Sequence, residues 1–117
     1  MESVESVAVK AMNKNIDINK VCRIKKYIPI EEKFRILNDF DKLFKEHIGD
    51  YPGFESFIAY VFFNLTMVKE YTDINIEFTY ECFDKLQTND LMSRILNEVG
   101  QDYKLFLNFV KMQNNFQ

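Results

Sequence analysis

The chain has 117 residues, enough for one folded domain and too few for two of ordinary size. Apolar residues make up 47 % of the composition and aromatic residues 15 %, which excludes a disordered chain. Only three glycines and two prolines occur, which favours helices over a sandwich of many short strands. The formal net charge of −3 makes non-specific nucleic-acid binding a poor candidate function, so we expect no nucleic-acid partner.

The charge is unevenly distributed along the chain. Residues 1–35 carry eight Lys or Arg against five Asp or Glu, whereas residues 36–117 carry seven against thirteen. The basic cluster within residues 20–26 is too small to change the expectation about nucleic acid, and a solvated surface segment is sufficient to explain it.

The first fifteen residues are expected to be flexible or to become ordered only on a partner. Val4, Val7 and Ala11 fall on one face of a short helix over residues 3–13, but short isolated helices are marginally stable. Residues 16–28 combine the apolar spacings of a helix and of a strand. An extended segment and a short helix therefore both stay open for this part of the chain.

The clearest helix begins at Pro29. Proline is favoured in the first turn of a helix, and Glu31 and Glu32 then place negative charge at the positive end of the helix dipole. Gly49 is expected to end this helix, because glycine is common just after the last helical turn. The predicted apolar stripe comprises Phe34, Leu37, Phe40, Phe44 and Ile48.

A second helix, predicted near residues 54–71, is apolar on almost every side. A helix of this kind must be covered on every side, so we expect it to be the central helix or to present one face to another chain. Its most apolar stretch is shorter than the roughly 20 residues that a transmembrane helix needs, so we expect no membrane span.

Shorter elements follow the apolar helix. Residues 72–78 alternate between polar and apolar side chains, which predicts a short extended connection. Thr79 is the expected N-cap of one short helix. Thr88 or Asn89 is the expected N-cap of the next helix, and Gly100 is expected to end it.

One further amphipathic helix completes the predicted elements. The sequence as a whole predicts an all-α fold, a single compact domain over residues 1–117 with four or five helices, built around the apolar helix near residues 54–71. No internal repeat and no low-complexity linker divides the chain.

No catalytic, cofactor-binding or metal site is predicted. The three glycines stand alone, and one histidine with two separated cysteines, Cys22 and Cys82, falls short of the four ligands of a structural zinc site. Both thiols are expected to be reduced. His47 lies late in an amphipathic helix, where a cation interacts favourably with the helix dipole. We therefore expect a protein that is not an enzyme and binds no cofactor.

Three sequence clusters stand out by their order and spacing: residues 26–33 (KYIPIEEK), residues 64–74 (NLxxVKEYTDI) and residues 83–86 (FDKL). Together they resemble a family of small phage and prophage proteins from Gram-positive bacteria, often encoded among virion and assembly functions. The clusters describe architecture, namely a helix start, a helix end and a short anchored helix. The resemblance implies a protein of the host cytoplasm or of the virion.

The expected function is that of a non-catalytic phage protein that binds other phage proteins. It would act as a virion structural component or an assembly factor, as a homo-oligomer or within a larger assembly. The alternative is a small phage-encoded inhibitor of a host defence nuclease, similar to anti-CRISPR proteins, whose carboxylates imitate phosphates. The candidate partner contacts lie in or beside the first two clusters. They are Lys25, Lys26, Tyr27, Lys33, Tyr71 and Asp73.

Overall fold

The computed structural model describes residues 1–115, and six α-helices within them make the fold all-α, as predicted. This is one helix more than the largest number expected. Two 3₁₀ turns, Ile18–Lys20 and Thr88–Asp90, and a parallel pair of two-residue strands, β1 (Glu2–Ser3) and β2 (Ile74–Asn75), accompany the helices. The helices are α1 (Val4–Lys10), α2 (Ile30–His47), α3 (Glu55–Tyr71), α4 (Tyr80–Leu86), α5 (Leu91–Val99) and α6 (Gln101–Asn115).

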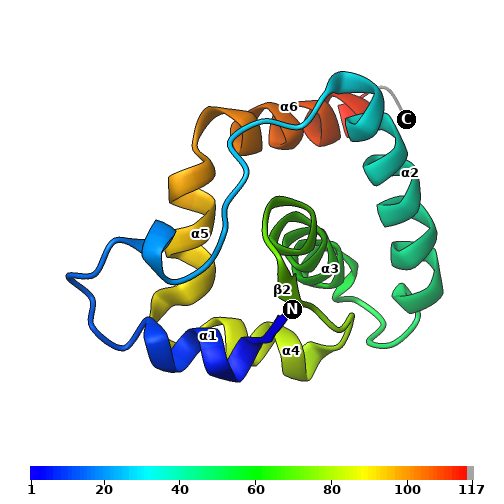
Figure 1. Ribbon diagram of the computed structural model, residues 1–117. Helices are drawn as coiled ribbons and strands as arrows, with labels where there is room; N and C mark the ends of the chain where they lie inside the picture. Colours follow the sequence, from blue (N-terminus) through cyan, green and yellow to red (C-terminus); the bar gives the residue numbers. More distant parts are fainter. Residues whose placement is uncertain (116–117) are drawn as a thin grey trace.

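The prediction of a central apolar helix is confirmed by α3. Figure 1 shows this helix nearly end-on, with α2, α6, α5 and the adjacent α1 and α4 around it. Its C-terminal part is enclosed, and Phe62, Leu65 and Val68 are completely buried. Its N-terminal part differs, because Phe57 and Tyr60 are exposed. None of the helices within residues 1–115 is both long and apolar enough to cross a membrane.

Helix α2 begins directly after Pro29, as predicted, and Leu37, Phe40 and Phe44 of the predicted apolar stripe pack against the core. The two ends of the stripe, Phe34 and Ile48, are exposed instead. Phe34 is 60 % exposed, whereas Lys33 is buried. The apolar pattern does not predict the burial of Lys33, because a buried lysine depends on a partner that lies far away in the sequence. At its other end, α2 stops at His47 and Gly49 follows the C-cap residue Ile48, so the predicted end is confirmed. The glycine with left-handed backbone in the turn to α3 is Gly53, with a φ of +93°.

Residues 1–15 were expected to be flexible or ordered by a partner, but contacts within the chain itself order them. The Ser3 hydroxyl caps α1 by accepting a backbone hydrogen bond, and Val7 and Ala11 are buried. The Ala11 carbonyl accepts a hydrogen bond from Arg94 of α5 at 2.6 Å. The short helix is stable in this setting because neighbouring helices cover its apolar face.

Residues 16–28 contain both conformations that the sequence left open. A single 3₁₀ turn is followed by an extended stretch in which Ile24 forms an antiparallel bridge with Thr72. The extended connection predicted over residues 72–78 contains β2, which pairs with β1 at the start of the chain.

The N-cap prediction is right for α4 and wrong for α5. Thr79 caps α4 through its hydroxyl oxygen, which accepts a backbone hydrogen bond at 3.0 Å, and Gly100 ends α5 with a φ of +70°. At the start of α5, Asn89 and Asp90 both have left-handed backbone, with φ of +56° and +57°. The Asn89 side chain donates to the carbonyl of Ala8 in α1 at 2.8 Å instead of capping α5.

A buried ion pair joins the first turns of α2 and α6. The Lys33 ammonium lies 2.8 Å from Asp102 Oδ1, and the two side chains are 1 % and 7 % exposed. Asp102 Oδ2 accepts hydrogen bonds from the Tyr71 hydroxyl at 2.5 Å and from the Ile28 N–H at 3.0 Å. The Lys33 ammonium also donates to the Ile28 carbonyl. The charges therefore satisfy each other and the polar groups around them, as buried charges must.

Aromatic rings surround the buried ammonium. Lys33 Nζ lies 4.8 Å from the centre of the Tyr27 ring and 5.4 Å from that of Phe106, within the range of cation–π attraction. Burial acts to raise the pKa of the Asp102 carboxyl, but its three hydrogen-bond donors outweigh burial, so this pKa lies below its ordinary value. Burial and the neighbouring carboxylate raise the pKa of Tyr71 far above its ordinary range.

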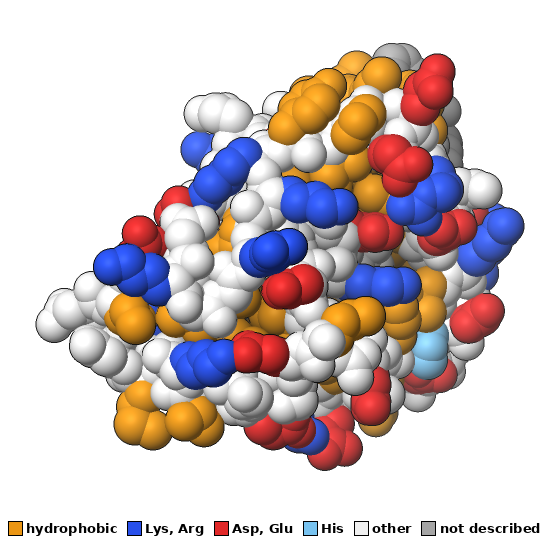
Figure 2. All heavy atoms as spheres, viewed as in Figure 1, with side chains coloured by type: hydrophobic (Ala, Val, Ile, Leu, Met, Phe, Trp, Pro, Cys, Tyr) orange, Lys and Arg blue, Asp and Glu red, His pale blue; other side chains and the backbone are white. Residues whose placement is uncertain are grey.

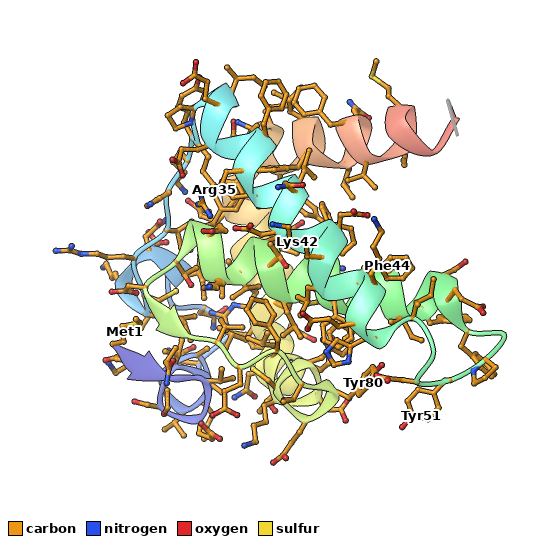
Figure 3. The ribbon with its side chains drawn as sticks, turned by 90° about the vertical axis from the view of Figure 1, so that its right-hand side faces the viewer. Met1, Arg35, Lys42, Phe44, Tyr51 and Tyr80 are labelled. Atoms are coloured by element: carbon orange, nitrogen blue, oxygen red, sulfur yellow. The ribbon has the colours of Figure 1, made fainter. Side chains whose placement is uncertain are left out.

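The ion pair joins α2 and α6 at one end only. Figure 3 shows α2 (cyan to green) and α6 (orange to red) diverging from this end. The two helices therefore form the arms of a V with Lys33 and Asp102 at its apex, and residues of α3 line the space between the arms.

We predict that Lys33→Met destabilises the fold by about 3–5 kcal/mol, because it leaves the buried Asp102 carboxylate without its cation. Urea unfolding followed by circular dichroism measures the change. The double variant Lys33→Met/Asp102→Leu removes both charges and is expected to recover most of the loss. The control Lys45→Met breaks an exposed pair with Asp41 and should cost less than about 1 kcal/mol. If Lys33→Met and Lys45→Met lowered the free energy of unfolding equally, the role given to Lys33 would be contradicted.

Stability is also expected to fall in acid through Asp102. Its pKa is lower in the folded chain than in the unfolded chain, where an aspartate titrates near about 3.9. The contribution of Asp102 to the free energy of unfolding is therefore complete above about pH 4. It is lost as the pH falls through the pKa that Asp102 has in the folded chain. Urea unfolding at a series of acidic pH values should show a shallower decline for Asp102→Asn than for the wild type. If the free energy of unfolding fell equally steeply in the wild type and in Asp102→Asn, Asp102 would not be the group responsible.

Candidate protein-binding surface

The six predicted partner contacts do not form one surface. Lys33 and Tyr71 belong to the buried cluster around Asp102, which corrects their assignment as partner contacts. Their polar ends are used inside the domain, so neither side chain is available to a partner in the folded chain. The resemblance clusters that contain them describe architecture, and these two residues are part of that architecture.

The other four predicted contacts are exposed but lie apart. Lys26 forms an ion pair with Glu98 of α5 at 2.6 Å, which fastens the segment before α2 to the domain. Tyr27 covers the buried ammonium with one face of its ring. Lys25 and Asp73 line one shallow hollow beside the bridge between the extended segments. Of the four exposed residues, only Lys25 and Asp73 line a common hollow.

A groove with aromatic walls lies at the start of α3, and we call it the aromatic groove. Tyr51 and Phe54 are each 56 % exposed, and Phe57 is 67 % exposed. Phe54 is the N-cap residue of α3 and Phe57 lies in the first turn of this helix, and their rings lie side by side. The groove encloses about 390 Å³ and is lined by Tyr51, Phe54, Phe57, Ile58, Val61 and Tyr80.

The turn between α2 and α3 fixes the backbone that carries these rings. Gly53 has a φ of +93°, a conformation that strains any residue with a Cβ atom. Its N–H donates to Glu55 Oε1 at 3.2 Å, and the Phe54 N–H donates to the Tyr51 carbonyl at 3.0 Å. The rings of Phe54 and Phe57 have their centres 6.0 Å apart. The aromatic side chains are thus exposed on an ordered backbone.

A polar cluster of His47, Asp50 and Tyr80 supports the groove from α2 and α4. Asp50 Oδ2 lies 2.8 Å from His47 Nδ1 and 2.8 Å from the Tyr80 hydroxyl. The His47 ring stacks on the buried Phe62 with ring centres 4.2 Å apart, and the Tyr80 ring meets that of Tyr51 edge-on at 5.6 Å. Figure 3 shows Tyr51 and Tyr80 close together beside the end of α2.

The pKa shifts in this cluster indicate a structural support. Hydrogen bonds with His47 and Tyr80 hold the pKa of Asp50 below its ordinary value. Burial, together with the hydrogen bond to Asp50, raises the pKa of Tyr80 to about 12. The six residues that line the groove carry no amine, thiol or carboxylate for a histidine to activate. The arrangement therefore holds the Tyr80 ring in place at the wall of the groove.

The thiols and the possible metal ligands do not add chemistry to this picture. Within residues 1–115, no three His, Cys, Asp or Glu side chains lie close enough to hold a metal ion. Cys22 and Cys82 are buried as free thiols. Burial raises the pKa of Cys22 to about 11, which keeps it in the weakly nucleophilic thiol form.

Reasoning from the sequence missed the aromatic groove. The sequence left open that the apolar helix near residues 54–71 presents one face to another chain, but it did not identify the residues of that face. A usable signal is present, because aromatic residues recur at every third position from 51 to 60, beginning inside a turn. The spacing of His47 and Asp50, three residues apart across a helix end, likewise allows their contact.

We predict that one tyrosine ionises near pH 12 and that Asp50→Asn lowers its pKa toward the ordinary value of about 10. The asparagine side chain keeps an acceptor oxygen but carries no negative charge, and the negative charge of Asp50 disfavours the phenolate. Its NH2 group can also donate to a phenolate, which a carboxylate cannot do. Ultraviolet absorbance titrations, each corrected by subtracting the matching Tyr80→Phe variant, isolate Tyr80. If Asp50→Asn leaves this titration unchanged, the hydrogen bond is not formed.

Comparisons with known proteins found no matching family model, no similar curated protein and no similar solved structure. The resemblance to small phage proteins therefore stays a prediction that depends on three sequence clusters. The aromatic groove and the surfaces around it supply the physical basis for assigning a function.

Proposed function

We propose that this chain is a non-catalytic domain that binds a partner protein in its aromatic groove. The observation that carries the proposal is the exposure of Tyr51, Phe54 and Phe57 around one apolar hollow. Aromatic side chains are enriched where proteins bind each other, and buried aromatic anchors contribute much of the binding energy. Contiguous exposed apolar surface on a small domain typically marks such a site.

The order of the groove supports this role. Gly53 and the hydrogen bonds of the turn fix one wall, and the pairing of Tyr80 with Asp50 fixes the other. A surface that is already in its binding conformation loses less conformational entropy when the partner arrives. The aromatic groove is therefore suited to hold an apolar side chain of a partner without rearrangement.

The proposed partners are phage proteins, with this chain acting as a virion component or an assembly factor. This part of the proposal is supported by the resemblance of the three sequence clusters. It places the protein in the host cytoplasm or in the virion.

Inhibition of a host nuclease has weaker support. A surface that imitates the phosphates of a nucleic acid needs carboxylates that are not neutralised nearby. Arg35 alone pairs with three carboxylates, and further carboxylates of α1, α4 and α5 pair with lysines. The exposed charges are therefore mostly balanced within the domain.

Site-specific photo-cross-linking tests the proposal. A benzophenone amino acid replaces Phe57, and the variant is produced in cells that are making phage particles. The matched control replaces Val9, which is 64 % exposed on α1, against 67 % for Phe57. We expect an adduct with a virion or assembly protein from position 57 and none from position 9. Phe57→Ala should then weaken binding of that protein by at least about tenfold.

Two outcomes of the cross-linking would count against this function. An adduct from position 57 that is no stronger than that from position 9 would remove the aromatic groove as a binding surface. A host nuclease as the main adduct would favour the inhibitor over the assembly role.

A further inference from the structure

A second apolar groove lies between the arms of the V formed by α2 and α6, and we call it the helix groove. It encloses about 500 Å³ and has α3 as its floor. Figure 3 shows Phe44 of α2 beside its wide end. Its apolar lining includes Leu37, Phe40, Phe44, Tyr60, Phe63 and Val110.

The helix groove and the aromatic groove lie on opposite sides of α3. Ala59 and Phe63 line the helix groove, whereas Ile58 and Val61 line the aromatic groove. These two pairs project in nearly opposite directions, because successive residues of a helix are rotated by about 100°. The helix groove is therefore a separate surface, and occupying it leaves the aromatic groove free.

The outer side of α6 carries an exposed apolar stripe. Leu105, Phe109 and Met112 follow one another at intervals of four and three residues, so they share one side of the helix. Leu105 and Met112 are exposed, whereas Phe106 on the inner side is completely buried. Figure 2 shows apolar side chains gathered over α6 and the start of α2 on the side in view. Helix α6 is thus apolar on two sides and has packed only one of them within its own chain.

The rim that α2 and α3 contribute to the helix groove carries carboxylates, whereas α6 carries lysines, of which Lys111 also lines the groove of its own chain. The groove carries Glu55 and Asp41 at the rim formed by α3 and α2, and Asp41 also pairs with Lys45. The one carboxylate of α6 is buried at the apex of the V, so its solvent-facing charges are Lys104 and Lys111. These lysines are seven residues apart and therefore lie on one flank of the apolar stripe.

We propose that the α6 helix of a second copy of this chain occupies the helix groove. One chain carries both complementary surfaces, so a two-fold dimer with each α6 in the groove of the other buries both stripes and both grooves together. Burial of apolar surface drives the association, and pairing of Lys104 with Glu55 of the other copy fixes its orientation.

Sedimentation velocity over a concentration series tests the dimer with a charge exchange. Lys104→Glu and Glu55→Lys each place two like-charge pairs in the symmetric interface and should raise the dimer Kd by about tenfold or more. An equimolar mixture of the two variants should restore dimerisation, because both pairs in the mixed dimer are again opposite in sign. Lys20→Glu makes the same charge change outside the interface and should leave the Kd unchanged.

The mixture distinguishes the proposed pairing from a loss of folding, because a misfolded variant cannot be restored by mixing. A wild-type chain that stays monomeric at every concentration overturns the proposal. A dimer that persists in both single variants, or a mixture that is not restored, also overturns it. Cross-linking from position 57 tests the aromatic groove separately, so either proposal can fail without the other.

Discussion

The pairing of Lys33 with Asp102 is the interaction on which the arrangement of the domain depends. One carboxylate receives an ammonium, a phenol and a backbone N–H, and it thereby connects α2, the end of α3 and the segment before α2 to the first turn of α6. Removing two charges from water is costly, and well-packed apolar residues often serve stability equally well. The geometric consequence of this cluster is specific, because it joins α2 and α6 at a single point and leaves the space between them open.

Local signals made much of the fold predictable. Pro29 with the glutamates after it located the start of α2, Thr79 located the start of α4, and Gly100 located the end of α5. The continuous apolar run identified α3 as the central helix. Each of these signals acts within a few residues, so the sequence alone carries it.

The errors arose where a distant residue determines the outcome. Lys33 looked like a surface cation because its partner lies 69 positions away. The first fifteen residues looked marginal because the covering surface comes from α4 and α5. The exposure of Tyr51, Phe54 and Phe57 was not predicted, because no local pattern shows which side of an apolar helix its neighbours leave uncovered. Binding surfaces are difficult to identify from a sequence for this reason, since apolar residues have the same chemistry in a core and at an interface.

The left-handed pair Asn89 and Asp90 has a consequence for how the molecule opens. A left-handed conformation costs most residues with a Cβ atom about 1–2 kcal/mol, and Asn and Asp adopt it more readily than the others. Asn89 bonds to the carbonyl of Ala8, and Asp90 pairs with Lys14 at 3.0 Å, so both compensating contacts come from the first fifteen residues. Undocking of α1 removes these contacts and releases the strain in the same step, which lowers the free energy of that local unfolding. Helix α1 and the joint between α4 and α5 therefore form one cooperative unit. The amides of these two segments should exchange hydrogen at similar rates, and faster than the amides in the enclosed part of α3.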